Sequence, residues 1–280
     1  MGDYILGVGQ KGSERLQRLD DILGPYSRRF LLDAGLAQGI KVIEFGCGTG
    51  NMTKWIAEQI GPAGSIVAVD SSEEQVNIAR DRCAKLGKNR IEFIVSSAEA
   101  LVLPDDSFDL AYARLFLMHL REPKQILKKM HEILRSKGIL ITEEPNAKSL
   151  FTYSSGTIFE RINEVLLKMG EKLGLDFEIG DKLFGFHREL SRQIIKSHFI
   201  MPVIPIPDAK EFIGIAAKEG LKTAINLKVI SRNEADSLLN ELLSLPDNPC
   251  GYYGWTRHAQ VASIKSLSHE GINRGDNFES

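Results

Sequence analysis

The sequence predicts an α/β fold with a mostly parallel, seven-stranded sheet that has helices on both faces. Two observations carry this prediction. Short apolar runs alternate with helical segments between residues 41 and 142, a spacing typical of βαβ units with right-handed crossovers. A glycine-rich loop joins the first apolar run to the helical segment that follows it. The 280 residues, 43% of them hydrophobic, suffice for one large α/β domain or for a core with a smaller appended unit.

The first forty residues mix charged and apolar positions at helical spacing and predict helices, with a break at Gly24-Pro25. From there the alternation begins. The apolar runs that predict strands are 41–45, 65–69, 91–95, 108–113 and 139–142. The intervening helices are expected at 51–60, stopped by Gly61-Pro62, at 71–86, with capping boxes at Ser71 and Ser72 and Gly87 as its end, and at 123–134.

After Pro145 the strand–helix rhythm ends. Apolar residues at helical spacing over 158–173 predict an amphipathic helix. The apolar, proline-containing segment 199–206 predicts an edge strand or an extended segment rather than a central strand. Further expected elements are a helix over 208–218 closed by Gly220, a helix opened by the capping box of Ser231 and Glu234 and ending before Pro246, a last strand at 261–264, and a polar tail from Ser266.

These patterns divide the chain into four parts. We expect an N-terminal helical lid over 1–37, a ligand-binding core over 38–146, a helical cap or substrate region over 147–257 that includes the edge strand near 199–206, and the last strand with its tail over 258–280.

Composition excludes several classes of protein. A formal charge of −2 gives no strong attraction to nucleic acid or to an anionic membrane. No apolar run is long enough for a transmembrane helix, and the N-terminus has no signal-peptide pattern. The three cysteines, Cys47, Cys83 and Cys250, are far apart and form no C-x-x-C, which favours a reducing compartment, the cytoplasm, and disfavours a disulfide framework or a metal site.

The loop from Gly46 to Gly50 carries the main functional signal. Its spacing is G-x-G-x-G, whereas dinucleotide-binding loops have G-x-G-x-x-G. Glu44 precedes the loop, where a carboxylate would repel a pyrophosphate and attract a cationic group. Asp70 ends the next predicted strand, where a carboxylate can accept both hydroxyls of a ribose. Together the residues favour a cationic nucleoside ligand and disfavour NAD.

Four segments resemble those of a known family. Residues 42–50 resemble the first motif of class I S-adenosylmethionine-dependent methyltransferases. Residues 96–109 are similar to the G-D-A-E-x-L-P-F-x-D-x-S-F-D segment of the UbiE-like branch, also described as methyltransferase-domain type 11/25, and residues 113–120 and 134–140 match its later segments. The resemblance covers about residues 38–146. It implies a Rossmann-like fold with N-terminal helices and a helical cap insertion, and S-adenosyl-L-methionine as cofactor.

The resemblance also implies roles for individual residues. Glu44, Gly46 and Gly48 are expected to hold the methionine end of the cofactor, Cys47 to lie among the cofactor-binding residues, Asp70 to hold the ribose with Ser71 beside it, Ala98 and Glu99 to lie along the adenine, and Arg114 and Leu115 to line the floor near the methionine. Ser97 stands where the family has an Asp that binds the adenine amino group. Its hydroxyl is uncharged and shorter in reach, so the adenine contact is the one that departs from the pattern.

The expected reaction is transfer of a methyl group to an O, N or C atom of a small, partly apolar metabolite by in-line displacement. Such a transfer proceeds largely by positioning and exclusion of water, and a general base helps when a hydroxyl is the acceptor. His119 is the candidate catalytic base, although a histidine that only packs in the core is the favoured interpretation. His187 is a second candidate, for which a surface loop is favoured.

Other residues have two interpretations. Tyr4 and Arg15 either close over the cofactor or pack on the surface. The aromatic residues of 147–220 either cap an acceptor pocket or form the core of the insertion, and Tyr252, Tyr253 and Trp255 either reach the pocket or form a hairpin cluster.

The alternatives to a small-molecule methyltransferase are a non-catalytic protein that binds S-adenosylmethionine and an NAD-dependent oxidoreductase. A nucleic-acid methyltransferase is disfavoured, because residues 113–116 lack the D/N-P-P-Y/F/W motif. The oligomeric state is left open, a homodimer being one alternative.

Overall fold

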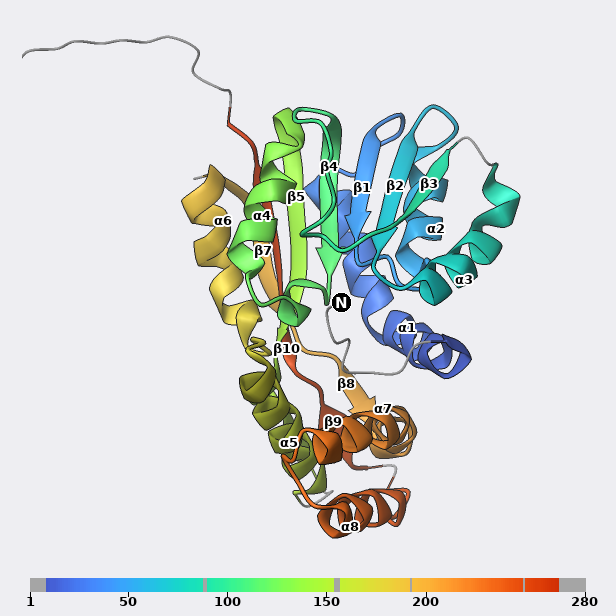
Figure 1. Ribbon diagram of the computed structural model, residues 1–280, viewed down its shortest axis with the longest axis vertical. Helices are drawn as coiled ribbons and strands as arrows, with labels where there is room; N and C mark the ends of the chain where they lie inside the picture. Colours follow the sequence, from blue (N-terminus) through green and yellow to red (C-terminus); the bar gives the residue numbers. More distant parts are fainter. Residues whose placement is uncertain (1–8, 88–89, 154–156, 192, 249, 267–280) are drawn as a thin grey trace, which may run out of the picture.

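The computed structural model describes residues 9–87, 90–153, 157–191, 193–248 and 250–266 (Figure 1). A twisted sheet with helices on both faces forms the larger part of the molecule, and a mainly helical cap lies beyond one end of the sheet. The predicted residue Tyr4 and most of the predicted polar tail lie outside the described residues.

The sheet has seven strands, as predicted. In the order in which they lie side by side they are β3 (Ile91–Val95), β2 (Ser65–Asp70), β1 (Lys41–Phe45), β4 (Phe108–Arg114), β5 (Leu134–Asn146), β10 (Arg257–Ile264) and β7 (Ile194–Ile200). The first five are parallel, and β10 is antiparallel to both β5 and β7. β1, the strand that leads into the glycine loop, lies in the middle of the sheet, and the strand order along the chain changes direction between β1 and β4. The loops that follow β1 and β4 therefore meet at one edge of the sheet.

Helices cover the two faces in separate groups. One face packs against α1 (Gly9–Ala34), α2 (Asn51–Ile60) and α3 (Glu73–Cys83), and the other against α4 (Pro123–Glu132) and α6 (Leu183–Ser191). Alternate residues of each central strand feed the two cores: Val42 and Leu110 belong to the first, and Ile43 and Ala111 to the second.

The cap combines helices with a small second sheet. Its helices are α5 (Ile158–Leu173), α7 (Ile206–Asn226) and α8 (Arg232–Leu243), and its antiparallel strands, in spatial order, are β6 (Phe151–Tyr153), β9 (Tyr252–Gly254) and β8 (Val203–Pro205). The capping box of Ser231 and Glu234 opens α8 as predicted. Short 3₁₀ turns lie at η1 (Ala84–Leu86), η2 (Leu117–His119), η3 (Ala147–Ser149) and η4 (Ile179–Lys182).

Two predicted helix boundaries are wrong. The break at Gly24-Pro25 does not occur, because α1 runs through Pro25. Leu23 and Phe30, on either side of the proline, are buried against the protein, and Arg28 pairs with Asp20 across it, so packing outweighs the lost backbone bond. Gly220 does not end the later helix either, since buried Leu221 continues α7 beyond it and the cost of an interior glycine is only about 1 kcal/mol.

The predicted edge strand also lies elsewhere. Segment 199–206 is divided: its first two residues close β7, which begins at Ile194, Val203–Pro205 form β8 of the small sheet, and Ile206 begins α7. Pro202 separates the two strands, because proline cannot donate a hydrogen bond to a sheet ladder.

Candidate functional site

The glycine loop is folded against the end of the neighbouring strand. The N–H groups of Gly46 and Cys47 both donate to the carbonyl of Val69, at 2.9 and 3.0 Å. Gly46 has φ +70°, and a Cβ on it would lie 2.7 Å from the ring of Phe116. Glycine is therefore required at position 46 both by the backbone and by its neighbour.

Glu44 is a buried acid directly before this loop. Only 4% of the residue is exposed, and Thr53 of α2 donates a hydrogen bond of 2.5 Å to its Oε2. Burial raises the pKa of Glu44 to about 7, although the bond from Thr53 and the charge of Arg114 oppose the rise. A buried carboxylate whose charge is this poorly compensated attracts a cation.

Asp70 ties the end of β2 to the loop. Its Oδ2 accepts the N–H of Gly48 at 2.8 Å and its Oδ1 accepts the N–H of Ser72 at 2.9 Å. Burial raises the pKa of Asp70, and these backbone bonds act against the rise. Each carboxylate oxygen keeps acceptor capacity for one more donor, so the group can still receive hydroxyls from a ligand.

The remaining predicted residues of this end line the same cavity. They are Ser71 after β2, and Ser97, Ala98 and Glu99 after β3. Lys129 of α4 donates to the carbonyls of Ala98 and Glu99, at 3.3 and 2.7 Å, and so fixes that loop. The Ser97 hydroxyl accepts the N–H of Ala100 within its own turn. Cys47 also lines the cavity, and burial raises the pKa of its thiol.

The segment after β4 closes the floor. Arg114 donates to Asp20 of α1 at 3.0 Å and to the Ser27 hydroxyl at 3.2 Å. Leu115 has φ +53°, a left-handed conformation that costs energy for a residue with a Cβ. Its N–H donates to the Glu143 carbonyl at 2.9 Å, which helps to hold the conformation.

Glu144, which sequence reasoning missed, holds the next residues. It is fully buried and accepts backbone N–H groups from Phe116 at 2.9 Å, Leu117 at 2.7 Å and Met118 at 3.4 Å. Burial raises its pKa to about 8 against the effect of these bonds. A sequence signal for this residue exists. Two adjacent acids, Glu143 and Glu144, directly follow the apolar run of the predicted strand 139–142, where buried side chains are expected.

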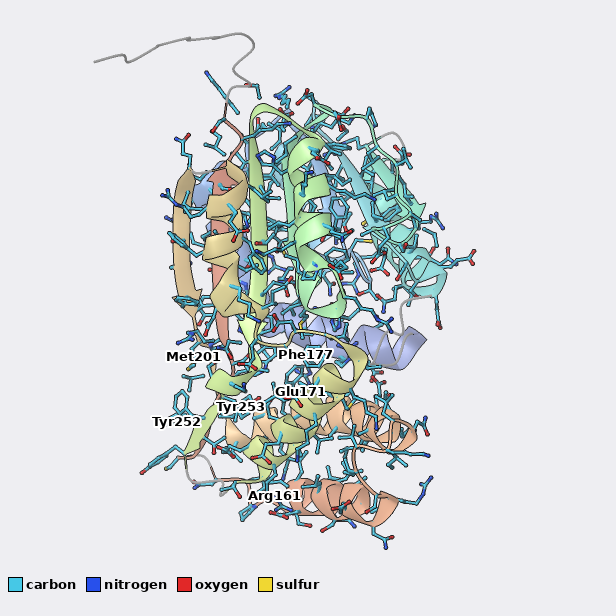
Figure 2. All side chains as sticks on the ribbon, turned by 60° about the vertical axis from the view of Figure 1, so that its left-hand side comes forward. Arg161, Glu171, Phe177, Met201, Tyr252 and Tyr253 are labelled. Carbon is cyan, nitrogen blue, oxygen red and sulfur yellow. The ribbon has the colours of Figure 1, made fainter. Side chains whose placement is uncertain are left out.

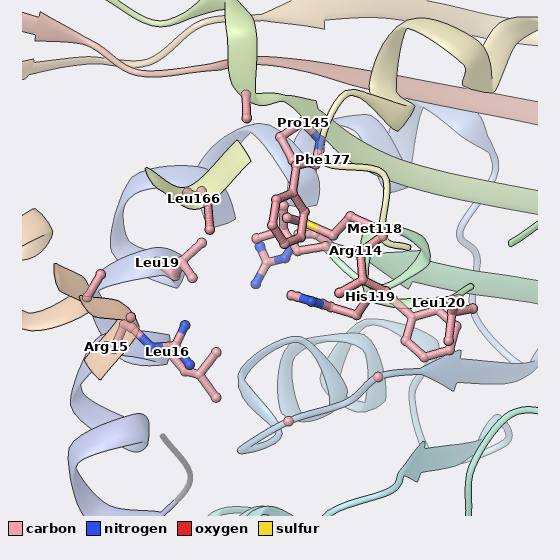
Figure 3. Close-up of a pocket in the computed structure, with 18 of the residues that line it drawn as sticks. Arg15, Leu16, Leu19, Arg114, Met118, His119, Leu120, Pro145, Leu166 and Phe177 are labelled. Carbon is pink, nitrogen blue, oxygen red and sulfur yellow. The ribbon is translucent and has the colours of Figure 1, made fainter. Parts of the chain in front are cut away.

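His119 ends this floor segment and lines the cavity. Its ring lies 6.2 Å, centroid to centroid, from that of Phe177, in an edge-on arrangement. Burial lowers its pKa to about 4, so the imidazole is neutral at pH 7. Figure 3 shows Phe177 beside Met118, Arg114 and His119, with Leu166 of the cap further away across the pocket.

His187 is not the surface-loop residue that the sequence favoured. It lies in α6 with no exposed surface, and its two ring nitrogens contact the hydroxyls of Thr142 and Ser263, both at 2.8 Å. It does not line the cavity and is a core histidine that joins α6 to the sheet.

The cavity has a volume of about 1010 Å³ and runs from the glycine loop to the cap. Pockets for small molecules span about 300–1,000 Å³, so this cavity is at the upper end of that range. Beyond His119 its wall is apolar, with contributions from α5, α7 and the β9 region: Leu150, Phe159, Ile162, Val165, Leu166, Met169, Phe177, Phe212, Ile213, Leu221, Tyr253 and Trp255. In Figure 2, Phe177 lies at the end of the cap near the sheet and Arg161 at the far end.

The two interpretations of the aromatic residues therefore both apply. Phe159, Phe177 and Phe212 line the cavity, as do Tyr253 and Trp255. By contrast, Tyr153 is 57% exposed and stacks on Tyr252 in the small sheet.

Helix α1 covers the glycine loop. The Asn51 side chain donates to the Leu16 carbonyl at 3.3 Å, and Arg82 of α3 donates to Gln17 at 2.9 Å. Arg15 is buried, lines the cavity and pairs with Glu219 of α7 at 3.7 Å. The N-terminal helix thus bridges the core and the cap above the site, and Figure 3 shows Arg15, Leu16 and Leu19 on its side of the pocket.

Thr256 and His258 also line the cavity and were missed by sequence reasoning. They lie where the chain passes from the cap into β10, and no local motif marks them. In the part of the chain that the structure describes, no group of three or more His, Cys, Asp or Glu side chains could hold a metal ion, and no helix is long and apolar enough to cross a membrane.

Comparisons with known proteins agree with this geometry. A model of the methyltransferase domain family matches residues 36–178, slightly more than half of the chain. The ubiquinone/menaquinone biosynthesis C-methyltransferase UbiE of Hahella chejuensis is 33% identical over 119 residues, which are 42% of this chain and 48% of that protein. The chain therefore spans about half the length of this relative.

Two further matches cover more of the chain. The demethylmenaquinone methyltransferase of Staphylococcus aureus is 24% identical over 208 residues, 71% of this chain and 86% of that protein. The crystal structure of a methyltransferase-like protein from Bacillus halodurans superposes with a TM-score of 0.58 at 14% identity, covering 86% of this chain and 98% of that one. At this identity the superposition shows the fold alone.

Proposed function

This chain belongs to the methyltransferase domain family, and from that premise we propose that it transfers a methyl group from S-adenosylmethionine to an O, N or C atom of a small, partly apolar molecule. One observation carries the proposal: a single cavity has a buried acid, a glycine loop and a second acid at one end, and an apolar wall at the other.

The residues present at the first end fit the cofactor. Glu44 supplies a buried negative charge for the ammonium of its methionine part, and Gly46 leaves the backbone accessible where a Cβ would clash. Asp70 has acceptor capacity for the ribose hydroxyls beyond its bonds to Gly48 and Ser72. When bound, the cofactor supplies a methyl group on a positively charged sulfur, a strong electrophile.

At the adenine end the fit rests on the loop after β3. Ala98 and Glu99 line the cavity there, and Lys129 fixes their carbonyls. Ser97 offers only a short, uncharged hydroxyl that also accepts the N–H of Ala100, so we propose that the adenine is held by shape and backbone groups more than by this side chain.

The protein contributes positioning and a dry environment. Arg114 and the segment after β4 hold the floor, and α1 and the cap enclose the pocket against water. An apolar wall favours an acceptor with a substantial hydrocarbon surface, because burial of about 25 cal/mol per Å² then contributes to binding.

The alternatives have less support. A non-catalytic binding protein needs no room beside the cofactor, whereas this cavity continues into the cap. An NAD-dependent oxidoreductase would place a pyrophosphate beside buried Glu44. A formal charge of −2 argues against a nucleic-acid substrate. Cys47, Cys83 and Cys250 are all unpaired, which supports our proposal of a reducing compartment such as the cytoplasm.

The test has two stages. Isothermal calorimetry of the purified protein with S-adenosylmethionine and S-adenosylhomocysteine should show binding, and NADH under the same conditions should not. Radiolabelled S-adenosylmethionine with a metabolite extract should then yield a labelled organic-soluble product. Absence of binding at high micromolar cofactor would refute the proposal.

A further inference from the structure

Two polar side chains at the apolar end of the cavity have no role in the proposed function so far. Thr256 is 5% exposed and His258 is 2% exposed, and both line the cavity. Thr256 directly precedes β10, and His258 is the second residue of that strand, where it pairs with Pro145 near the carboxyl end of β5. The antiparallel direction of β10 therefore brings these late residues to the sheet edge that carries the glycine loop.

Hydrogen bonding fixes the tautomer of His258. Its Nδ1 lies 2.7 Å from the carbonyl oxygen of Thr256. Because a carbonyl oxygen only accepts, Nδ1 must carry the proton and donate it. Burial lowers the pKa of His258 to about 4, and the charge of Arg114 adds to the effect, so the ring is neutral at pH 7. Nε2 is therefore left with a lone pair and acts as a pure acceptor.

This acceptor has no donor within the described part of the chain. Neither His258 Nε2 nor the Thr256 hydroxyl has a hydrogen-bond partner there, although both atoms are buried. Buried polar atoms are normally satisfied, and His187 shows this within the same chain, since each of its ring nitrogens contacts a hydroxyl.

The imidazole of His258 packs among aromatic and apolar side chains. Trp255 packs edge-on against the imidazole with 4.9 Å between ring centroids, and Phe212 packs against Trp255 at 5.2 Å. Leu19 of α1 belongs to the same apolar cluster as Trp255. A molecule that enters this end of the cavity and carries one hydrogen-bond donor on an apolar body matches these contacts.

We propose that His258 Nε2 and the Thr256 hydroxyl bind a hydroxyl group of the methyl acceptor, which selects a largely apolar alcohol or phenol. The acceptor's O–H donates to Nε2, and the Thr256 O–H donates to the same oxygen. This inference rests on the proposed function, because it assigns the second molecule of the same cavity. It makes His258 and Thr256 specificity-determining residues, and it divides the cavity into a cofactor end and a hydroxyl-reading end.

The experiment uses two probes with the same propylphenyl body, of which only the first carries a hydrogen-bond donor: 4-propylphenol and its methyl ether, 4-propylanisole. Binding of each is measured by calorimetry to the full chain saturated with S-adenosylhomocysteine. The wild-type protein should prefer the phenol by roughly fivefold or more, the worth of one hydrogen bond to a buried acceptor. In His258→Asn the amide can still donate to the Thr256 carbonyl, but the Nε2 acceptor is gone, so the preference should fall to about twofold or less.

A second variant and a spectroscopic readout keep the test independent of the stability of His258→Asn. Thr256→Val preserves shape and should weaken phenol binding only. In ¹⁵N-labelled wild-type protein, the Nε2 resonance of His258 should move on addition of the phenol and stay in place with the ether. His187→Asn, a buried histidine outside the cavity, is the matched control and should keep the wild-type preference.

The outcomes separate the two proposals. If S-adenosylhomocysteine does not bind, the proposed function is wrong. If it binds but the wild-type protein does not distinguish phenol from ether, or if His258→Asn and Thr256→Val retain the preference, the hydroxyl-reading role is overturned and the methyltransferase proposal stands.

Discussion

Arg114, at the end of β4, donates a 3.0 Å hydrogen bond to Asp20, near the middle of α1. Asp20 is 4% exposed and also pairs with Arg28, about two helical turns further on. Next to this pair, the Ser27 hydroxyl accepts a hydrogen bond from Arg114 and donates one of 2.9 Å to Glu143. The helix that covers the glycine loop is thus held to the sheet by charged groups that are largely shielded from water.

Loss of this link should loosen α1. In Arg114→Met, Asp20 keeps Arg28 but loses its partner on the sheet. Removing one member of a buried pair costs about 3–5 kcal/mol when nothing replaces it, so we expect roughly 2 kcal/mol here. Hydrogen exchange should accelerate in α1 and remain slow in α2. The double variant with Asp20→Asn should recover part of the stability, and unchanged exchange in α1 would contradict the prediction.

Cofactor affinity should depend on pH through Glu44. Its pKa is raised to about 7 without ligand, and the ammonium of the cofactor favours the ionised form. Affinity should therefore be constant above about pH 8 and fall by up to about tenfold per unit below pH 7, with a proton released on binding. Calorimetry in two buffers of different ionisation enthalpy measures that proton. Glu44→Gln should bind about 10–100-fold more weakly at pH 8 and lose most of the pH dependence.

The raised pKa of Glu44 has the opposite effect on stability: cofactor affinity should rise with pH, whereas the unfolding free energy of the ligand-free protein should fall. The folded state holds a proton on Glu44 up to about pH 7, whereas the unfolded chain releases it near the usual carboxyl pKa of 4.5. The contribution of this group to the unfolding free energy therefore declines as pH rises from about 4.5 to about 7. Thermal unfolding of wild type and Glu44→Gln across this range should diverge accordingly.

The ribose role of Asp70 can be separated from its structural bonds. Asp70→Asn keeps one acceptor oxygen, while Asp70→Ala removes both bonds, to Gly48 and Ser72. We expect Asp70→Ala to lose roughly 100-fold in S-adenosylhomocysteine affinity. Wild-type protein should prefer adenosine over 2′,3′-dideoxyadenosine, and this preference should shrink in Asp70→Asn. An equal loss of affinity for both nucleosides would indicate a structural role only.

Two glycines with the same backbone angle provide a matched pair. Gly46 and Gly174 both have φ +70°, but only Gly46 has a neighbour, the Phe116 ring, within 3 Å of an added Cβ. Gly174→Ala should cost about 1–2 kcal/mol from the backbone alone. Gly46→Ala should cost more and should abolish cofactor binding, which Gly174→Ala should retain. Equal costs in chemical denaturation would contradict the steric argument.

His119 should contribute shape more than proton transfer. A pKa near 4 is poorly matched to a general base at neutral pH, so His119→Asn should lower kcat by less than about tenfold with the acceptor found in the extract screen. The pH–rate profile should keep its form. A loss of about 10²–10⁴-fold would instead identify His119 as the base.

The elements predicted best are those defined by local signals. Strand Lys41–Phe45 and helix Asn51–Ile60 have the predicted bounds, because an apolar run, a glycine loop and a Gly-Pro stop mark them within a few residues. The cofactor end of the cavity was predicted for the same reason: Glu44 and Asp70 stand at strand ends that the pattern alone places at one sheet edge.

The rest depends on contacts between distant segments. Strand Ile194–Ile200 is half exposed and has weak apolar alternation, and its pairing with β10 is decided more than fifty residues later. Likewise, the role of Glu144 follows only from its bonds to the segment after β4. The role of His258 follows only from a cavity assembled from α1, the core and the cap. Propensity could not reveal these residues, because tertiary packing gives them their environment.

The placement of β10 between β5 and β7 has a consequence for the order of assembly. β7 pairs with no other described strand, so residues 194–200 have no neighbouring strand until residues 257–264 have left the ribosome. The glycine loop and β1 to β5 can form before β10 is synthesised, whereas the sheet is completed and the Thr256–His258 segment placed only after β10 has emerged. During translation, the nucleoside end of the cavity should therefore take shape before the end that receives the acceptor.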